Sequence, residues 1–493
     1  MRTLRTTRLL VMVTVGAIVV TACGQSTTPS APNGSQEPVP SAAPGSTVPE
    51  PSAAQTFSVP SFAPADLRWY CCLGTGEDPT QKPTEDEVAA GFADKYPGSS
   101  MKFEVVTYDD AVATLSTQLA ANAPDIVGPV GIGGLGSFKG QWLDLAPYLQ
   151  SSNYDMSVYD PKTVEFFKQD GVQVGVPFDL YPSMLWYKKE FFDEIDLAEP
   201  PHEWGAKYTM PDGTEVDWDY DTLRQVAMLL TVDKNGKDAT DPAFDPKNIV
   251  QFGFEPQRDD LRQTGAYFGA GSLVGEDGKT VVIPDAWKAA WKFMYDGIWK
   301  DHFIMTEAQF NDAKVGGGDQ AFFGGHVAMA NNFLWTSYGV TGDEAVVKDW
   351  NLAAIPSYNG TATSPLNADT FSILKNSKNP DAAFAGLAYL HQDSADELLP
   401  IYGGIPAVTS QQDAFFAGLE NAEGYPEGVD WKVAKDAIQY ADIPNFEGYM
   451  PKYNETLDVL EKYRSRWTTT PSLDMDQEIE KLRAEIQAKW DAA

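Results

Sequence analysis

Two adjacent cysteines, Cys71 and Cys72, have the plainest redox chemistry in this sequence. Two thiols without a distant partner can stay reduced, bond to each other or crosslink two chains. Neighbouring Cα atoms lie ~3.8 Å apart, below the usual disulfide range, so a bridge between them is strained. If that bridge forms, the sequence predicts a rigid apolar platform at this loop.

Other motifs for chemistry are weak. Residues 131–136 fit the dinucleotide pattern G-x-G-x-x-G, but they follow a third predicted strand, so we expect a flexible glycine loop that meets ligands. The acidic run 233–245 lacks EF-hand spacing and is expected to be a solvated turn. The histidines have no zinc-ligand spacing, and no G-x-S-x-G elbow occurs. The four histidines are His202, His302, His326 and His391.

These observations predict no metal, no cofactor and no catalytic residue. Among 70 acidic residues, a glycosidase-like carboxylate pair stays open, but nothing singles one out.

Alternating strands and helices are predicted to position the first candidate residues. A capping-box pattern at Thr84–Glu87 predicts a helix start, and Pro97 predicts its end. Strand–helix–strand–helix–strand order indicates an α/β fold with a parallel sheet. The predicted elements are strands 67–71, 101–107 and 126–130, and helices 84–96 and one that ends near Asn122.

Apolar stripes at helical spacing predict two later helices that pack on the core. The first stripe is Trp287, Trp291, Met294, Tyr295, Ile298 and Trp299, and the second is Met475, Ile479, Leu482 and Ile486. Asn235-Gly236 and Asp277-Gly278 predict tight turns.

The N-terminus has the layout of an export signal, with a basic start followed by a 14-residue apolar stretch, 9–22. This stretch is shorter than the ~20 residues that span a bilayer. It ends Val-Thr-Ala-Cys, which resembles the bacterial lipoprotein signal, so 1–22 is predicted to be removed and Cys23 to be lipidated. Residues 23–65, rich in proline and serine, are predicted to form a tether. The protein is therefore expected to be extracytoplasmic and held to the membrane only by its lipid.

Composition excludes one class of partner. The chain has 36 basic and 70 acidic residues and a net charge of −34, which argues against nucleic acid. About 430 residues after the tether exceed a comfortable single core, so two or more domains are expected.

Five sequence stretches resemble, in order, the sugar-binding group of extracellular solute-binding proteins of ABC importers, which includes maltose-binding protein. The match covers most of residues 66–410. The stretches are F-A-D-K-Y-P-G at 92–98, L-A-A-N-A-P-D-I-V at 119–127, G-V-P-F-D with L-W-Y-K-K-E-F-F at 175–192, A-A-I-P with N-S-K-N-P-D-A-A at 353–383, and G-G-I-P-A at 403–407. Lys188, where the family usually has asparagine, and Cys71-Cys72 depart from the pattern.

The resemblance implies a two-lobed periplasmic-binding-protein-like α/β fold with ligand in the cleft between the lobes. Lobe 1 would hold 66–178 and 359–400, and lobe 2 would hold 183–356 and 402–493. Hinge segments would lie near 179–182, 356–358 and 401–402.

Candidate ligand contacts are aromatic and polar residues at strand ends, because rings cover the C–H faces of sugars and polar groups bond their hydroxyls. The resemblance assigns a stacking role to Trp335 and a carboxylate-bearing stretch to Glu255 and Arg258. Asp125 is equally expected to cap its strand. The remaining candidates are Trp69, Tyr70, Glu77, Asp78, Asp179, Asp369 and Tyr402.

We therefore expect a non-enzymatic, monomeric subunit that captures a carbohydrate and delivers it to an ABC permease. The same fold binding a polyol phosphate, a peptide or a polyamine is the first alternative. A secreted glycosidase is the second alternative, and turnover would reveal it.

Overall fold

The computed structural model describes residues 56–258, 260–312, 322–340, 346–420, 422, 424–443 and 449–492. The predicted leader, Cys23 and most of the predicted tether lie outside these residues. Contacts define one compact unit, Gln55–Ala493. The end of the predicted tether packs on this unit, because Phe57 meets Tyr154 edge-on and the Ser58 N–H donates to the Ser152 carbonyl at 3.0 Å.

The first elements alternate as the sequence predicts. They are β1 (Asp66–Cys71), α1 (Lys82–Lys95), β2 (Ser100–Val105), α2 (Tyr108–Ala121) and β3 (Ile126–Gly131). Strand β1 pairs in parallel with both β2 and β3, which confirms the predicted parallel sheet.

Two local predictions in this region are wrong. Helix α1 begins at Lys82 without a side-chain cap, because Pro83 suits the first turn of a helix and starts it ahead of Thr84. The predicted glycine loop is instead α3 (Ile132–Ser137). A side chain at Gly134 would lie 2.7 Å from the Leu73 carbonyl oxygen, so the glycine permits close packing there.

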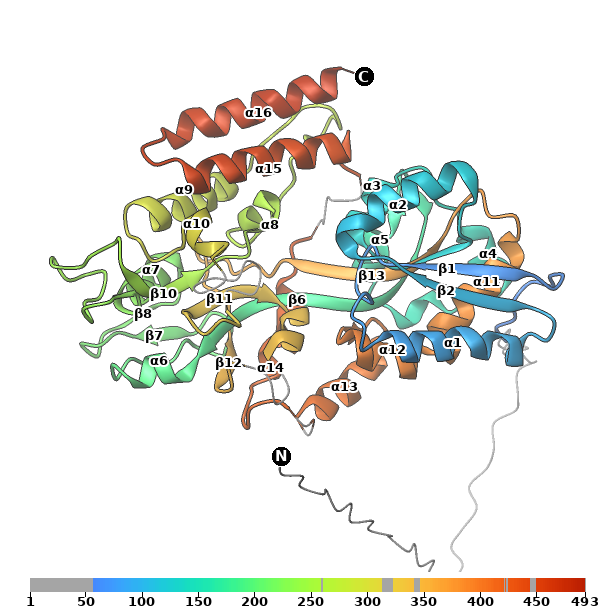
Figure 1. The fold of residues 1–493 in the computed structure, drawn as a ribbon, viewed down its shortest axis with the longest axis horizontal. Helices are drawn as coiled ribbons and strands as arrows, with labels where there is room; N and C mark the ends of the chain where they lie inside the picture. The colour runs from blue at the N-terminus through green and yellow to red at the C-terminus, as the bar shows by residue number, and fades with distance from the viewer. Residues whose placement is uncertain are drawn as a thin grey trace, which may run out of the picture. The chain divides into compact units, whose positions relative to one another are not determined.

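Strand β6 (Val176–Lys188) is thirteen residues long and buried throughout, and it runs through the middle of the main sheet (Figure 1). Its first half pairs with β13 (Leu366–Ile373) and β14 (Ile405–Pro406). Its second half pairs with β11 (Val327–Phe333) and β12 (Trp350–Ala353). The sheet order is β2-β1-β3-β13-β6-β11-β10-β9, with β10 at Ile249–Glu255 and β9 at Val232–Asp233.

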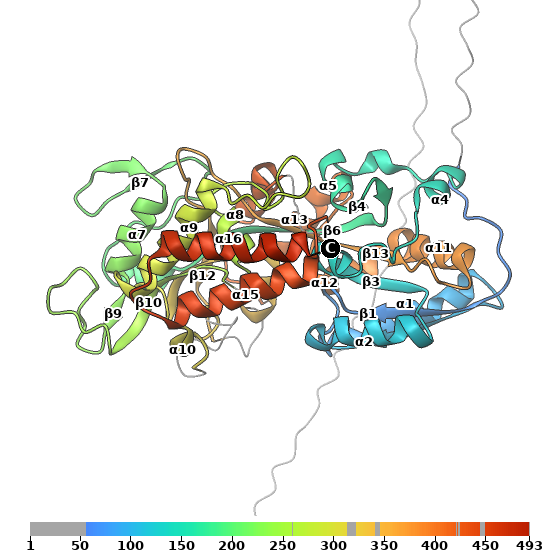
Figure 2. The same ribbon diagram turned by 90° about the horizontal axis from the view of Figure 1, so that it is seen from above.

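Helices cover the second half of the sheet. They include α7 (Tyr220–Leu229), α8 (Leu261–Ala266), α9 (Asp285–Trp299), α15 (Tyr453–Thr469) and α16 (Met475–Asp491). Helices α15 and α16 lie side by side, with α15 against α8 and α9 (Figures 1 and 2). Both predicted apolar stripes are confirmed as core, except that Trp299 is half-buried.

The remaining elements are short connectors and covering helices. They are α4 (Ala146–Ser151), α5 (Pro161–Phe166), β4 (Lys168–Gln169), β5 (Val172–Gln173), α6 (Lys189–Asp193), β7 (Lys207–Thr209), β8 (Glu215–Asp217), α10 (Glu307–Phe310), α11 (Pro380–Ala388), α12 (Ala395–Tyr402), α13 (Gln412–Leu419) and α14 (Lys432–Ala437), with 3₁₀ turns at Met156–Val158, Leu334–Val340, Thr409–Gln411 and Ile438–Tyr440 and a π turn at Tyr389–Asp393.

Two large apolar cores lie along β6. The first gathers β1–β3, β13 and α11, and the second gathers α7–α9, α15 and α16. Tyr402, Phe416 and Trp431 contribute to the first core, although the resemblance places 402–493 in lobe 2. The predicted lobe boundaries stay a prediction.

Within the described residues, the structure contains no helix with the length and apolarity needed to cross a membrane.

Candidate ligand-binding site

Within the described residues, three segments of the chain pass between the two cores, and hydrogen bonds connect these segments to one another. Strand β6 crosses near Ser183, whose N–H donates to the Pro365 carbonyl at 3.0 Å. The connection from β12 to β13 pairs at Ser364 with Ala441. The Leu366 N–H donates to the Asp442 carboxylate at 2.8 Å. The crossing is therefore a hydrogen-bonded unit.

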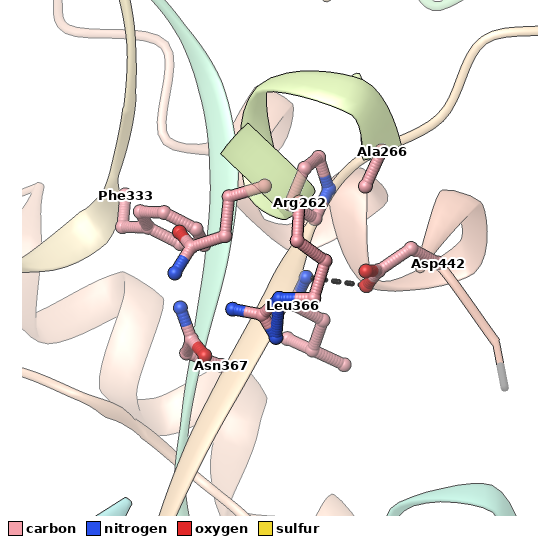
Figure 3. A pocket seen from close by; sticks show the side chains of 8 residues that line it. Arg262, Ala266, Phe333, Leu366, Asn367 and Asp442 are labelled. Carbon is pink, nitrogen blue, oxygen red and sulfur yellow. Dashed lines mark hydrogen bonds between the residues drawn. The ribbon is translucent and has the colours of Figure 1, made fainter. Parts of the chain in front are cut away.

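A small cavity lies at this crossing (Figure 3). Arg262, on α8, points toward the start of β13, where Asn367 lies. The side-chain oxygen of Gln263 is buried and makes no hydrogen bond within the described chain, so an acceptor is available there. The other lining residues are Ala266, Phe333, Pro365, Leu366 and Asp442. The cavity thus joins residues from four separate stretches of sequence.

Charge at this cavity is nearly balanced. Asp260 caps α8 and accepts from the Arg262 guanidinium, with Nε at 3.1 Å. Burial raises the pKa of Asp442 to about 7, against the opposing effect of Arg262. The cavity therefore offers hydrogen-bonding groups with little net charge near neutral pH.

An aromatic wall adjoins the cavity. The rings of Phe333 and Trp335 stack with centroids 4.2 Å apart and planes at 19°. Trp335 also lies 5.6 Å from the ring of Tyr181. Because Trp335 is only half-buried while Tyr181 is 1% exposed, Trp335 offers the accessible surface of this wall.

Tyr181 connects the wall to a pair of buried carboxyl groups. Its hydroxyl donates to Asp179 at 2.9 Å and to the Tyr402 carbonyl at 3.1 Å. Asp179 and Asp369 are register partners on β6 and β13. Asp369 accepts from the backbone N–H of Thr75 at 2.8 Å and from its hydroxyl at 2.9 Å.

The two carboxyl groups share a water-poor site and repel as anions. Burial raises the pKa of Asp369 to about 6. Burial and the charge of Asp369 raise the pKa of Asp179 well above its usual range. At neutral pH the pair therefore keeps one proton, because two buried carboxyl groups this close are not both ionised.

Tyr108 is an exposed aromatic residue of the first half. It begins α2 and is 54% exposed. Desolvation and the charges of Asp369 and Asp260 raise its pKa. Asp369 belongs to β13 of the first half and Asp260 to α8 of the second. The exposed ring of Tyr108 thus lies within electrostatic range of carboxylates from both halves.

The structure brings together only part of the predicted set. Asp179, Asp369, Trp335 and the Tyr402 backbone converge on Tyr181. The Tyr402 side chain is buried and donates to Glu85 at 3.0 Å. Glu77 accepts from the backbone N–H of Tyr108 at the start of α2.

The other predicted residues serve the fold. Trp69 and Tyr70 are fully buried and donate to the carbonyls of Gly128 and Ala111. Asp78 accepts from Thr80 in a local turn. Asp125 accepts from the N–H of Arg68 and from Ser377, so it ties β1 to a later loop. These four positions are therefore not part of the proposed site.

Glu255 and Arg258 are buried and pair with each other. Arg258 also donates to the Met305 carbonyl at 2.9 Å and lies 4.3 Å over the ring of Phe310. Burial raises the pKa of Glu255 to about 7, although Arg258 opposes that shift. Most polar atoms of the pair thus meet partners within the protein, and the pair is also left out of the site.

Sequence reasoning missed Thr75, Tyr108, Arg262, Gln263 and Asn367. Tyr181 fell inside a predicted hinge segment but was not assigned a role. The signal that could have found it is the neighbouring Asp179, two residues away on the same face of a strand.

The sulfur atoms of Cys71 and Cys72 are joined in the structure and are fully buried. A side chain at Gly76 would lie 2.9 Å from the Cys71 sulfur. The cysteine pair thus packs beneath the loop that carries Thr75.

Lys188, which departs from the family pattern, is fully buried over the rings of Phe191 and Phe322, at 5.3 and 4.8 Å. Its ammonium makes no hydrogen bond within the described residues, and burial lowers its pKa to about 7.

In the described part of the chain, no group of three or more His, Cys, Asp or Glu side chains could hold a metal. Within the predicted solvated turn, the Asp233 carboxylate accepts N–H groups from Asn235, Lys237 and Asp245. Its oxygens therefore serve the backbone of the turn.

Glu85 gives a test of how burial governs these carboxyl groups. It is fully buried, one of its oxygens has no partner, and burial raises its pKa to about 7 from 4.5. A raised pKa contributes stability at low pH that is lost as pH rises through 7. Glu85→Gln is therefore expected to raise the unfolding free energy at pH 8 by about 3 kcal/mol and to change little at pH 4.

Denaturant unfolding at both pH values measures this difference. Glu87→Gln, at an exposed position on the same helix, is the matched control and is expected to change stability at neither pH. An equal effect of Glu85→Gln at pH 4 and pH 8 would contradict the burial argument.

A sheet shared by two cores, with aromatic and polar groups at their crossing, defines an α/β binding protein of the two-lobed periplasmic type. Solved structures share this fold. An ABC substrate-binding protein from Listeria monocytogenes in complex with cycloalternan has 18% identity and a TM-score of 0.67, over 87% of this chain and 99% of that one. The maltose/maltodextrin-binding domain of Bdellovibrio bacteriovorus bound to maltotriose has 18% identity and a TM-score of 0.61, over 87% and 99%.

A third structure is the GacH receptor of Streptomyces glaucescens, solved unliganded and with acarbose. It has 18% identity and a TM-score of 0.63, over 86% of this chain and 98% of that one. A sequence model of the bacterial extracellular solute-binding proteins matches residues 76–397, well over half of the chain. The protein belongs to this family, and its place is therefore outside the cytoplasm.

Proposed function

We propose that this protein is the carbohydrate-binding subunit of an ABC importer. The observation that carries the proposal is the half-buried Trp335 ring, which stacks on the buried ring of Phe333 beside the polar groups of the crossing. An aromatic face suits the C–H face of a sugar ring, and amide and hydroxyl groups suit its hydroxyls. Saccharides bound to the Listeria and Bdellovibrio proteins support the same ligand class.

The charge of the site favours a neutral ligand. A phosphate would need an available cation, yet Arg262 already pairs with Asp260. A polyamine would need several anionic carboxylates, yet burial raises the pKa of Asp179 well above its usual range and that of Asp442 to about 7. A neutral saccharide requires neither.

The working model is closure of two lobes around the ligand, with the lobes near the predicted boundaries and 402–434 packed on the first core. Closure would exclude water from the hydrogen bonds and present a fixed shape to the permease. The protein binds and delivers the sugar without chemical change, as a monomer held to the membrane through lipid on Cys23.

A thermal-shift screen of a chain that starts at Gln55 tests this proposal. Ligands would include mono- and oligosaccharides, amino acids, short peptides, polyamines and sugar phosphates. A ligand that binds only the folded state raises the melting temperature by mass action. We expect a shift with one class of neutral saccharide. A shift only with a peptide, polyamine or phosphate would refute the sugar assignment, and release of a cleaved product would refute the non-enzymatic role.

A further inference from the structure

A second hollow lies beside the crossing and shares no lining residue with the cavity of Figure 3. This outer groove has a volume of about 560 Å³. Its walls come from the stretch after α8, the first turn of α9, and segments 358–363 and 439–441. The volume lies in the range of small-molecule sites, roughly 300–1,000 Å³.

Aromatic rings in the outer groove are supported from behind. Tyr440 stacks on Trp204 with centroids 4.4 Å apart and planes at 11°. Tyr358 lies 5.0 Å from Phe268, which in turn stacks on Tyr220 at 3.8 Å. Tyr440 and Tyr358 are half-buried, so part of each ring faces solvent. Two braced rings thus offer flat apolar surface within one groove.

The rim segment that carries Tyr358 is a hydrogen-bonded tight turn. The N–H of Tyr358 donates to the Thr361 carbonyl at 2.9 Å, and the N–H of Thr361 donates back at 3.0 Å. Asn359 and Gly360 both have positive φ, at 50° and 77°, as a tight two-residue turn requires. The groove therefore needs little reorganisation to hold a ligand, which lowers the entropic cost of binding.

The polar groups of the outer groove suit a neutral polyhydroxylated ligand. The exposed side chains of three residues make no hydrogen bond to the described part of the chain. They are Asn359, Thr361 and Gln439. Asp285 is the charged residue among those that line the groove, and it pairs with Lys288 at 2.8 Å. No lysine or arginine lines the groove, so an anion would find no counter-charge there.

We propose that the outer groove is a second saccharide site, separate from the cleft, in which a sugar unit packs against Tyr440 and Tyr358. Its hydroxyls bond to the amide and hydroxyl groups of the rim.

Binding stoichiometry tests this proposal. Equilibrium dialysis of the chain from Gln55 with labelled maltose, cellobiose or trehalose at millimolar concentration is expected to show two molecules per chain for one of these sugars. Thr361→Trp fills the groove from an exposed position and is expected to weaken the second site at least tenfold. Thr214→Trp, at an exposed turn away from the groove, is the matched control and should keep both sites.

The ring of Tyr440 gives an independent readout. Tyr440→Phe keeps the stack and should retain the second site, whereas Tyr440→Ala should lose it. Trp335→Ala should lose the cleft site and keep the groove site, so failure of one proposal is distinguishable from failure of the other. One molecule per chain with all three sugars, or a second molecule that persists in Thr361→Trp, would overturn the groove assignment.

Discussion

Replacement of Trp335 by alanine is expected to weaken saccharide binding by about 30-fold, which corresponds to ~2 kcal/mol. Trp335 is half-buried, rests on Phe333 and touches Tyr181, so it is an accessible ring with support on two sides. Truncation removes the flat surface while the polar groups of the crossing remain. Calorimetric titration with the sugar found in the screen measures the loss.

The conservative variant separates stacking from general packing. Trp335→Phe keeps a ring against Phe333 and is expected to lose less than tenfold. Both variants should unfold cooperatively, because the side chain is not fully buried. Unchanged affinity in Trp335→Ala would contradict the proposed site, even if a sugar binds elsewhere on the chain.

Arg258→Met is expected to destabilise the protein by about 3–5 kcal/mol at pH 8, the cost of leaving one buried charge without its partner. Glu255 is 4% exposed and accepts from Arg258, with the Met305 N–H at 3.4 Å as its other contact. Methionine fills similar volume near Phe310 but supplies no charge and no donor to the Met305 carbonyl.

The pH dependence identifies the cause. With a pKa of about 7 in the folded state, Glu255 destabilises the fold as pH rises through that value, and loss of Arg258 enlarges this effect. The loss of stability in Arg258→Met is therefore expected to be smaller at pH 5, where Glu255 is protonated. Denaturant unfolding at both pH values measures it.

An exposed ion pair provides the control. Arg483 pairs with Glu480 on the surface of α16, and Arg483→Met is expected to change stability by less than about 1 kcal/mol. Folded Arg258→Met should keep wild-type saccharide affinity. A large loss of affinity without loss of stability would show that Arg258 contributes to ligand binding and would contradict its structural assignment.

Local patterns predicted much of the fold. Alternating strand residues and helical stripes gave β1 to β3, α1, α2, α9 and α16, because periodicity reports which face of an element is buried. The helix start at Thr84 was misplaced, since the proline at position 83 began α1 earlier. The glycine run became α3, because its packing against Leu73 lies beyond any local pattern.

The candidate site was less predictable. Trp335 was named through the resemblance, yet Glu255 and Arg258 from the same reasoning proved to be partners of each other. Their spacing of three residues was visible in the sequence, but their burial was not. Conversely, Arg262 and Gln263 carry no motif and became candidates only when α8 was placed beside β13.

The sequence by itself determined the class of protein: an acidic α/β chain with the ordered motifs of an extracellular solute-binding family. Only the tertiary structure decided which polar residues face a ligand. The reason is that the site is assembled by distant segments, with Thr75, Tyr181, Trp335 and Asp369 meeting where β6 passes between two cores. Strand register and the path of β6 set those contacts, and neither is written in any local stretch of residues.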